Sequence, residues 1–249
     1  MVKALRPSYS VIEADLPRHD LRDSDVCGRL AKDSGLDVII HLAWNTTSDN
    51  WGSSRVDPGN WRMAENILLS AREHQVPRVI LASSVHVHRY RDSRASNGSL
   101  LDVYGECVPA SAYGAQKLRM EQLGLWHSTK GLEVICVRFG GVSAPATPPR
   151  DYRVVGLTHA DCIEMIACCI EAHQVPNRYA VFYAVSANPE RIHDCANPFG
   201  WQPRDDAATF YEPRPSPKLF VGARRWCIGA VKQLKYCVRA CMRTGSDQP

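Results

Sequence analysis

The sequence predicts a doubly wound α/β fold, in which a parallel sheet is covered by helices on both faces. Two observations support it: five short apolar runs occur along the chain, and four segments of helical pattern alternate with them. Strands that are apolar along their whole length are buried on both faces, which is typical of a parallel sheet. Such folds bind their ligands at the carboxyl ends of the strands.

The individual elements follow from residue type and from the signals at their ends. Predicted strands cover residues 10–14, 37–42, 78–82, 132–137 and 179–185, which are rich in valine, isoleucine and tyrosine. Predicted helices cover residues 26–34, 60–74, 112–130 and 159–173. Gly35, Gly131 and the Val76-Pro77 pair mark the turns from helix to strand.

The domain organisation is expected to be one Rossmann-like domain over residues 1–217, followed by residues 218–249. Proline-rich stretches suggest a small carboxyl-terminal substrate lobe built from about 143–160 and 186–217. Residues 224–243 are basic, and apolar positions from Ile228 to Cys241 have helical spacing. We therefore expect a basic surface helix or a tail after residue 217.

Composition excludes several classes of function. A formal net charge of +4 on 249 residues gives no support for a nucleic-acid partner. No apolar run approaches the roughly 20 residues of a membrane span, and no signal segment begins the chain. The ten cysteines form no CxxC pair, and the histidines lack ligands at metal spacing, so no metal is expected. Reduced, buried thiols in a cytoplasmic protein are the expectation.

Tyr113 and Lys117 carry the chemistry. Four residues apart, they lie on one face of the predicted helix. An ammonium beside a phenol favours the phenolate and lowers the tyrosine pKa, which makes a base for alcohol–carbonyl chemistry. Ser84, at the end of a strand, is placed to hold the substrate oxygen. Alone, a Tyr-x-x-x-Lys pair also fits a solvated helix face, and Ser84 also fits a strand-end hydroxyl bonded to backbone.

Further segments occur in a family's order: residues 20–23, 37–43, Asn60, 78–84, 113–117 and 137–139. With them the chain resembles the extended short-chain dehydrogenase/reductase family, also called the NAD-dependent epimerase/dehydratase family. Residues 83–86, 157–161, 183–188 and 200–207 are similar to segments of its uronate dehydrogenase branch. The resemblance implies Tyr113 as general base, Lys117 as holder of the nicotinamide ribose and Ser84 as hydrogen-bond partner of the reacting oxygen.

The resemblance also implies a cofactor site and a substrate. NAD is expected rather than NADP, because a carboxylate at Asp15 would bind the adenosine ribose and repel a 2′-phosphate. Asp15 also fits a turn residue, and Asp20 and Asp23 also fit helix caps. The cofactor residues implied are Asp15, Asp20, Leu21, Leu42, Ala43, Asn60, Tyr113, Lys117, Phe139 and Gly140. His86 and Arg153 would join Ser84 in binding a sugar or sugar acid, with Arg153 facing a carboxylate.

Two other functions fit the same sequence. A nucleotide-sugar epimerase or dehydratase uses the same Tyr, Lys and Ser. A third hypothesis is a non-catalytic remnant that senses a dinucleotide or binds a partner. Trp44, Trp51 and Trp61 either stack on a sugar near the pocket mouth or pack. The family often dimerises through the helix bearing Tyr-x-x-x-Lys and the helix before it, so a homodimer is possible.

One departure from the family concerns the phosphate-binding loop. The family's first strand and glycine-rich loop should precede Tyr9, where only eight residues stand, and no G-x-x-G-x-x-G or G-x-G-x-x-G occurs. Residues 1–6 read as the tail of the helix after that loop. Since the loop holds the pyrophosphate and its strand is central, we expect a fragment or a weakened NAD site, with exposed strand edges.

Overall fold

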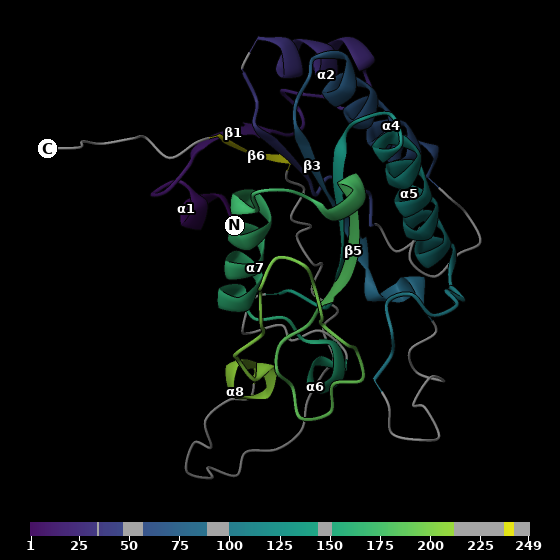
Figure 1. Ribbon diagram of the computed structural model, residues 1–249, viewed down its shortest axis with the longest axis vertical. Helices are drawn as coiled ribbons and strands as arrows, with labels where there is room; N and C mark the ends of the chain where they lie inside the picture. Colours follow the sequence, from purple (N-terminus) through teal and green to yellow (C-terminus); the bar gives the residue numbers. More distant parts are fainter. Residues whose placement is uncertain (34, 47–56, 89–99, 144–150, 212–236, 242–249) are drawn as a thin grey trace, which may run out of the picture.

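The computed structural model describes residues 1–33, 35–46, 57–88, 100–143, 151–211 and 237–241. Within them, one sheet has the strand order β1-β6-β2-β3-β4-β5 (Figure 1). The strands are β1 (Ser10–Ala14), β2 (Val38–His41), β3 (Arg78–Ser84), β4 (Glu133–Phe139), β5 (Tyr179–Ala184) and β6 (Cys237–Cys241). Strands β2 to β5 pair in parallel. Five of these strands coincide with predicted ones.

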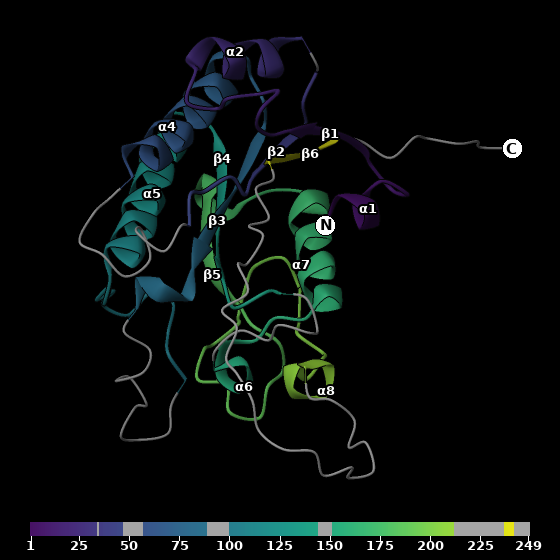
Figure 2. The same ribbon diagram turned by 180° about the vertical axis from the view of Figure 1, so that it is seen from behind.

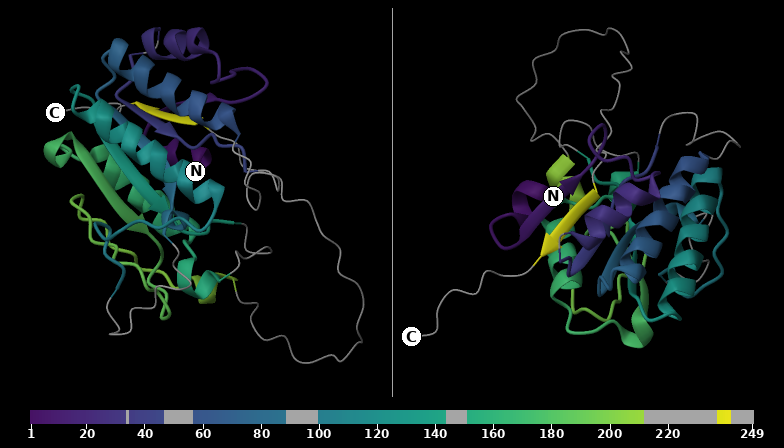
Figure 3. Two further views of the ribbon diagram at one scale, coloured as in Figure 1. Left: turned by 90° about the vertical axis from the view of Figure 1, so that its right-hand side faces the viewer. Right: turned by 90° about the horizontal axis from the view of Figure 1, so that it is seen from above.

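Helices cover both faces of the sheet, so the predicted doubly wound fold is confirmed (Figures 1 and 3). One face carries α2 (Ser24–Lys32), α4 (Pro58–Glu73) and α5 (Ala112–Ser128). The other carries α1 (Val2–Leu5) and α7 (His159–Glu171). Alternate strand residues feed two cores: Ile80 packs in the α7 core, whereas its neighbour Val79 packs in the α4 and α5 core.

Side-chain caps determine where the helices begin. Asp23 accepts from the backbone of Asp25 at the start of α2, and Asp57 accepts from Gly59 at the start of α4. Ser111 caps α5 and Thr158 caps α7 in the same manner. Each cap satisfies a backbone N–H that lacks a partner within its helix. Asp23 is therefore a helix cap, one of the two roles predicted for it.

Strand β6 corrects the prediction for the carboxyl-terminal segment. Residues 237–241 form a strand, not a basic helix or a tail, and it pairs antiparallel with both β1 and β2. The apolar spacing that suggested a helix does not exclude a strand, and the unpaired edges of β1 and β2 are satisfied by this pairing. The edges predicted to be exposed are thus covered. Residues 218–236 and 242–249 lie outside the described residues.

A lobe lies beyond the carboxyl ends of β4 and β5 (Figure 2). It contains α6 (Tyr152–Val155) and α8 (Ala207–Tyr211). The Asn188 amide donates to the carbonyl of Gly156, and the Tyr211 hydroxyl bonds to the backbone of Ser143, so residues of the two predicted lobe segments contact each other. Two short 3-10 turns, η1 (Val85–Val87) and η2 (Pro176–Arg178), follow β3 and precede β5.

Two properties of the described residues bear on the earlier expectations. No helix among them is long and apolar enough to cross a membrane. The seven cysteines whose side chains are described are all free: Cys27, Cys107, Cys136, Cys162, Cys168, Cys169 and Cys195. Burial raises the pKa of Cys136 and Cys169, so these thiols are kept protonated in the core.

Candidate active site

The end of β3 and the start of α5 bring Ser84 and Tyr113 together. The Ser84 hydroxyl lies close enough to the Tyr113 phenol to oppose part of the rise in its pKa, and both side chains are buried. The Ser84 hydroxyl oxygen also accepts the backbone N–H of His86 at 3.2 Å, which fixes it at the entrance to η1. A serine hydroxyl and a phenol at the carboxyl edge of a parallel sheet lie where doubly wound folds bind ligands.

Gly114 allows the start of α5 to pack closely against η1. A Cβ atom at Gly114 would stand 2.1 Å from the carbonyl oxygen of His86, so only glycine lets α5 approach η1 this closely. Gly114, the residue after Tyr113, is therefore a packing requirement for the approach of Tyr113 to Ser84.

Gly114→Ala is expected to push α5 away from η1 by about 1 Å and to reduce turnover roughly 100-fold, because misplacement on this scale costs that much. The measurement is kcat for NAD-dependent oxidation of a sugar acid such as a hexuronate. Gly28→Ala is the matched control, since a Cβ at Gly28 in α2 meets only an ordinary 3.7 Å contact. Equal effects of the two variants would contradict the packing role.

Lys117 lies one helical turn after Tyr113 and is 3% exposed. Its Nζ atom donates to the carbonyl oxygen of Ala82 at 2.6 Å and stands 3.7 Å from the centroid of the Trp44 ring. It is 5.8 Å from the Tyr113 ring centroid. The structure thus brings together all three predicted catalytic residues, Ser84, Tyr113 and Lys117.

The electrostatics of this cluster differ from the prediction. Burial raises the pKa of Tyr113 to about 12, opposed only by its hydrogen bond to Ser84. Burial also holds the pKa of Lys117 well below its usual value, although the neighbouring Glu121 carboxylate raises it. The pKa of Tyr113 is therefore raised, not lowered as expected from Lys117, because removal of the phenol from water disfavours its phenolate.

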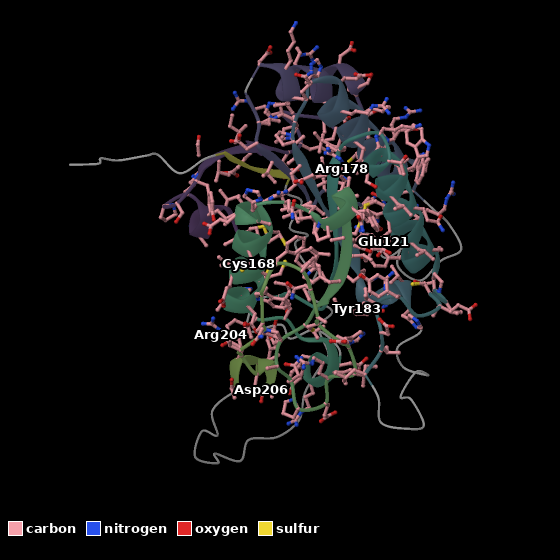
Figure 4. All side chains as sticks on the ribbon, in the orientation of Figure 1. Glu121, Cys168, Arg178, Tyr183, Arg204 and Asp206 are labelled. Atoms are coloured by element: carbon pink, nitrogen blue, oxygen red, sulfur yellow. The ribbon has the colours of Figure 1, made fainter. Side chains whose placement is uncertain are left out.

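Next to this cluster, Glu121 and Arg138 form a buried ion pair. Arg138 Nη2 lies 2.8 Å from the Glu121 carboxylate, and Arg138 also donates to Tyr183 Oη at 3.1 Å. Glu121 and Tyr183 are labelled in Figure 4. The Glu121 carboxylate also accepts the Ser83 hydroxyl. Glu121 was missed from the sequence, although its place four residues after Lys117 on the same helix face was a usable signal.

A separate pocket opens at the ends of β1 and β2, with about 540 Å³ of empty space that is partly open to solvent. Four of the predicted cofactor residues line it: Asp15, Asp20, Leu21 and Ala43. Arg22 grips Asp20 through both carboxylate oxygens, and that hydrogen bonding holds the pKa of Asp20 below its usual value. Sequence reasoning missed Asn45, Asp57 and Met63, which also line the pocket.

The pocket fits the adenosine end of a dinucleotide in its chemistry. Asp15 offers a carboxylate to ribose hydroxyls, while Leu21 and Ala43 offer apolar walls to a base. Leu21 is fixed there, because its carbonyl accepts the amide of Asn66 at 3.0 Å. In place of a strand that leads into a glycine-rich loop, the sheet has the antiparallel β6 between β1 and β2.

Of the remaining predicted cofactor residues, Leu42, Phe139 and Gly140 stand at or after strand ends, and Asn60 lies in α4. Phe139 is the register partner of Ser84 across β3 and β4, and Gly140 follows it with its N–H donated to Ala184. Leu42 follows β2 and packs at the edge of the α7 core. Asn60 is fully buried, and its amide bonds to both the N–H and the carbonyl of Asn45, so it clamps the loop after β2.

The predicted substrate residues differ in position. His86 lies at the cluster, with its ring edge-on to Tyr113 at 5.9 Å between centroids. Arg153 lies on α6 in the lobe, half-exposed and 3.6 Å from Glu190, so it would have to leave this pair to bind a substrate carboxylate. Of the three predicted pocket tryptophans, Trp44 lines the pocket, Trp61 stacks on Arg119, and Trp51 lies outside the described residues.

Comparisons with known proteins agree with the geometry. The chain is 30% identical over 192 residues to an NAD-dependent glucose-6-phosphate dehydrogenase of Haloferax volcanii, covering 71% of each protein. It is 28% identical over 197 residues to a uronate dehydrogenase of Agrobacterium fabrum, covering 77% of this chain and 69% of that protein.

A solved structure is similar to the same extent. A mutant of the Agrobacterium tumefaciens uronate dehydrogenase complexed with NAD superposes with a TM-score of 0.64 at 26% identity, covering 80% of this chain and 74% of that one. The resemblance to uronate dehydrogenases is thereby confirmed.

The family described as NAD dependent epimerase/dehydratase matches residues 4–164, and this match spans the Asp15 pocket and the Ser84–Tyr113–Lys117 cluster. The prediction of NAD as the cofactor agrees with that description. From the fold, the site and the matched sequence, the chain belongs to the NAD dependent epimerase/dehydratase family.

Proposed function

We propose that this protein is an NAD-dependent dehydrogenase of a sugar or sugar acid, with a hexuronate oxidised at its anomeric carbon as the first candidate. The observation that carries the proposal is the buried cluster in which the Ser84 hydroxyl lies beside the Tyr113 phenol and Lys117 lies one helical turn away. Relatives named as dehydrogenases of glucose-6-phosphate and of uronate support the substrate class. A cytoplasmic location and pairing of α4 and α5 in a homodimer belong to the same proposal.

In this reaction the chain's own residues handle the proton. Ser84 donates a hydrogen bond to the substrate hydroxyl oxygen, and the Tyr113 phenolate takes the proton of that hydroxyl. When bound, NAD supplies the acceptor for the hydride that leaves the same carbon, so an anomeric alcohol becomes a lactone. Asp15 would hold the adenosine ribose, and Lys117 would hold the nicotinamide ribose. Phe139 and Gly140 would flank the ring.

The test is reduction of NAD, followed at 340 nm, with glucuronate, galacturonate, glucose-6-phosphate and UDP-galactose offered in turn, and with NADP in place of NAD as comparison. Turnover with a uronate and NAD supports the proposal. Conversion of the nucleotide sugar without net NAD reduction would replace it by the epimerase function. No turnover with any of them would favour a non-catalytic role.

The pH dependence follows from the state of Tyr113. Because its pKa is raised to about 12, the phenol is protonated at neutral pH, and the base form grows as pH rises. We expect kcat/KM for oxidation to increase between pH 7 and 10, by up to about tenfold per unit. A plateau already below pH 8 would contradict this, and would show that Lys117 is charged in the loaded site.

A further inference from the structure

Trp44 touches both halves of the candidate site. Its ring lines the pocket that contains Asp15, and the same ring stands 3.7 Å from the Lys117 ammonium nitrogen. Lys117 itself does not line that pocket. The indole therefore stands between the adenosine-side pocket and the catalytic cluster, on the side of Lys117 that faces the pocket.

The backbone that carries Trp44 is firmly held. Asn45, the next residue, donates its N–H to Asn60 Oδ1 at 2.6 Å and accepts from Asn60 Nδ2 at 3.1 Å. The Asn45 amide also donates to Asp57 Oδ2 at 2.6 Å. Because the loop is clamped at this point, the position of the indole is set by its side-chain rotamer rather than by loop movement.

Two opposing effects act on that rotamer. The Lys117 Nζ atom lies over the ring face, 3.7 Å from its centroid, and this packing contact favours the described rotamer. Against it, the Trp44 Nε1 donor is buried without a hydrogen-bond partner among the described residues, which is unfavourable for an indole that is 6% exposed. A rotamer that frees this N–H and leaves Lys117 would remove that unfavourable burial.

We propose that Trp44 is a specificity-determining gate, which restricts the site to the adenosine end of a nucleotide until the indole leaves Lys117 and admits the full dinucleotide. This inference rests on the proposed function, because it takes NAD as the ligand that must reach Lys117. The apparent affinity for NAD is then reduced by the fraction of molecules in the open state, whereas the affinity for a mononucleotide is not.

The experiment is calorimetric titration of the whole chain with NAD and, separately, with AMP. In Trp44→Ala, we expect the ratio of NAD affinity to AMP affinity to rise roughly tenfold over that of the unaltered protein. Loss of the indole as a wall of the pocket acts on both nucleotides and therefore cancels in this ratio. Trp44→Phe keeps a smaller ring and should give an intermediate gain, which guards against a folding defect in the alanine variant. Trp61→Ala is the matched control, since that indole stacks on Arg119 of α5 at 4.8 Å, and Trp61 does not line the pocket.

Several results would overturn the gate. The gate is rejected if Trp44→Ala leaves the ratio of NAD affinity to AMP affinity unchanged, or if no variant binds NAD measurably. Equal tightening of both nucleotides also rejects it, because that result would indicate a general opening of the pocket. A raised NAD affinity without turnover of any sugar would support the gate and reject the dehydrogenase function, so the two failures are distinguishable.

Discussion

Replacing Tyr113 by phenylalanine is expected to lower kcat for sugar oxidation by about 10²–10⁴-fold, the range typical for loss of a positioned acid–base group. Phenylalanine preserves the buried ring but removes the oxygen that bonds to Ser84 and would accept the substrate proton. The measurement is the initial rate of NAD reduction, together with calorimetric binding of NAD. Binding is expected to persist, because the Asp15 pocket is left intact.

Tyr104→Phe is the control for this variant, since Tyr104 is 83% exposed and lies outside the cluster. It should leave kcat unchanged within twofold. If Tyr113→Phe and Tyr104→Phe turned over equally well, Tyr113 would not be the base. The cluster would then be a remnant of a catalytic site rather than a working one.

Removing residues 212–249 is expected to destabilise the domain strongly, because it deletes β6. Five register pairs with β1 and four with β2 would be lost, leaving two strand edges open in the interior of the sheet. With net ladder bonds worth about 1 kcal/mol each, the free energy of unfolding should fall by several kcal/mol. For a chain of this size that corresponds to a Tm lower by roughly 10–20 °C. The open edges should also promote aggregation, measured by size-exclusion chromatography.

Two further variants isolate the contribution of β6 to stability. Removing only residues 242–249 keeps every β6 pair and should leave Tm within a few degrees. Arg239→Pro removes one backbone N–H from a strand paired on both sides, at the position opposite Ile12 and Ile39, and should reproduce much of the loss. A truncated chain that melted like the full chain would show that β6 does not hold the sheet together in solution.

Much of the fold was predictable because its signals are local. The strand ending at Ser84 and the helix bearing Tyr113 and Lys117 follow from hydrophobic pattern and from the Ser111 cap, which depend on neighbours in sequence. The grouping of Ser84, Tyr113 and Lys117 was predictable for the same reason, together with the family resemblance. Glu121, Asn45 and Asp57 were missed, since their roles depend on partners from distant segments, as in the Glu121–Arg138 ion pair.

The alternation of strands and helices, the Ser84–Tyr113–Lys117 set and the family reside in residue type and spacing, so they could be predicted before folding was considered. The folded structure was needed to show that residues 237–241 pair between β1 and β2, because strand pairing is satisfied by segments far apart in the chain. It also decided the raised pKa of Tyr113, which arises from burial that spacing does not reveal. The contact of Trp44 with Lys117 likewise exists only because the segment after β2 meets α5 in space.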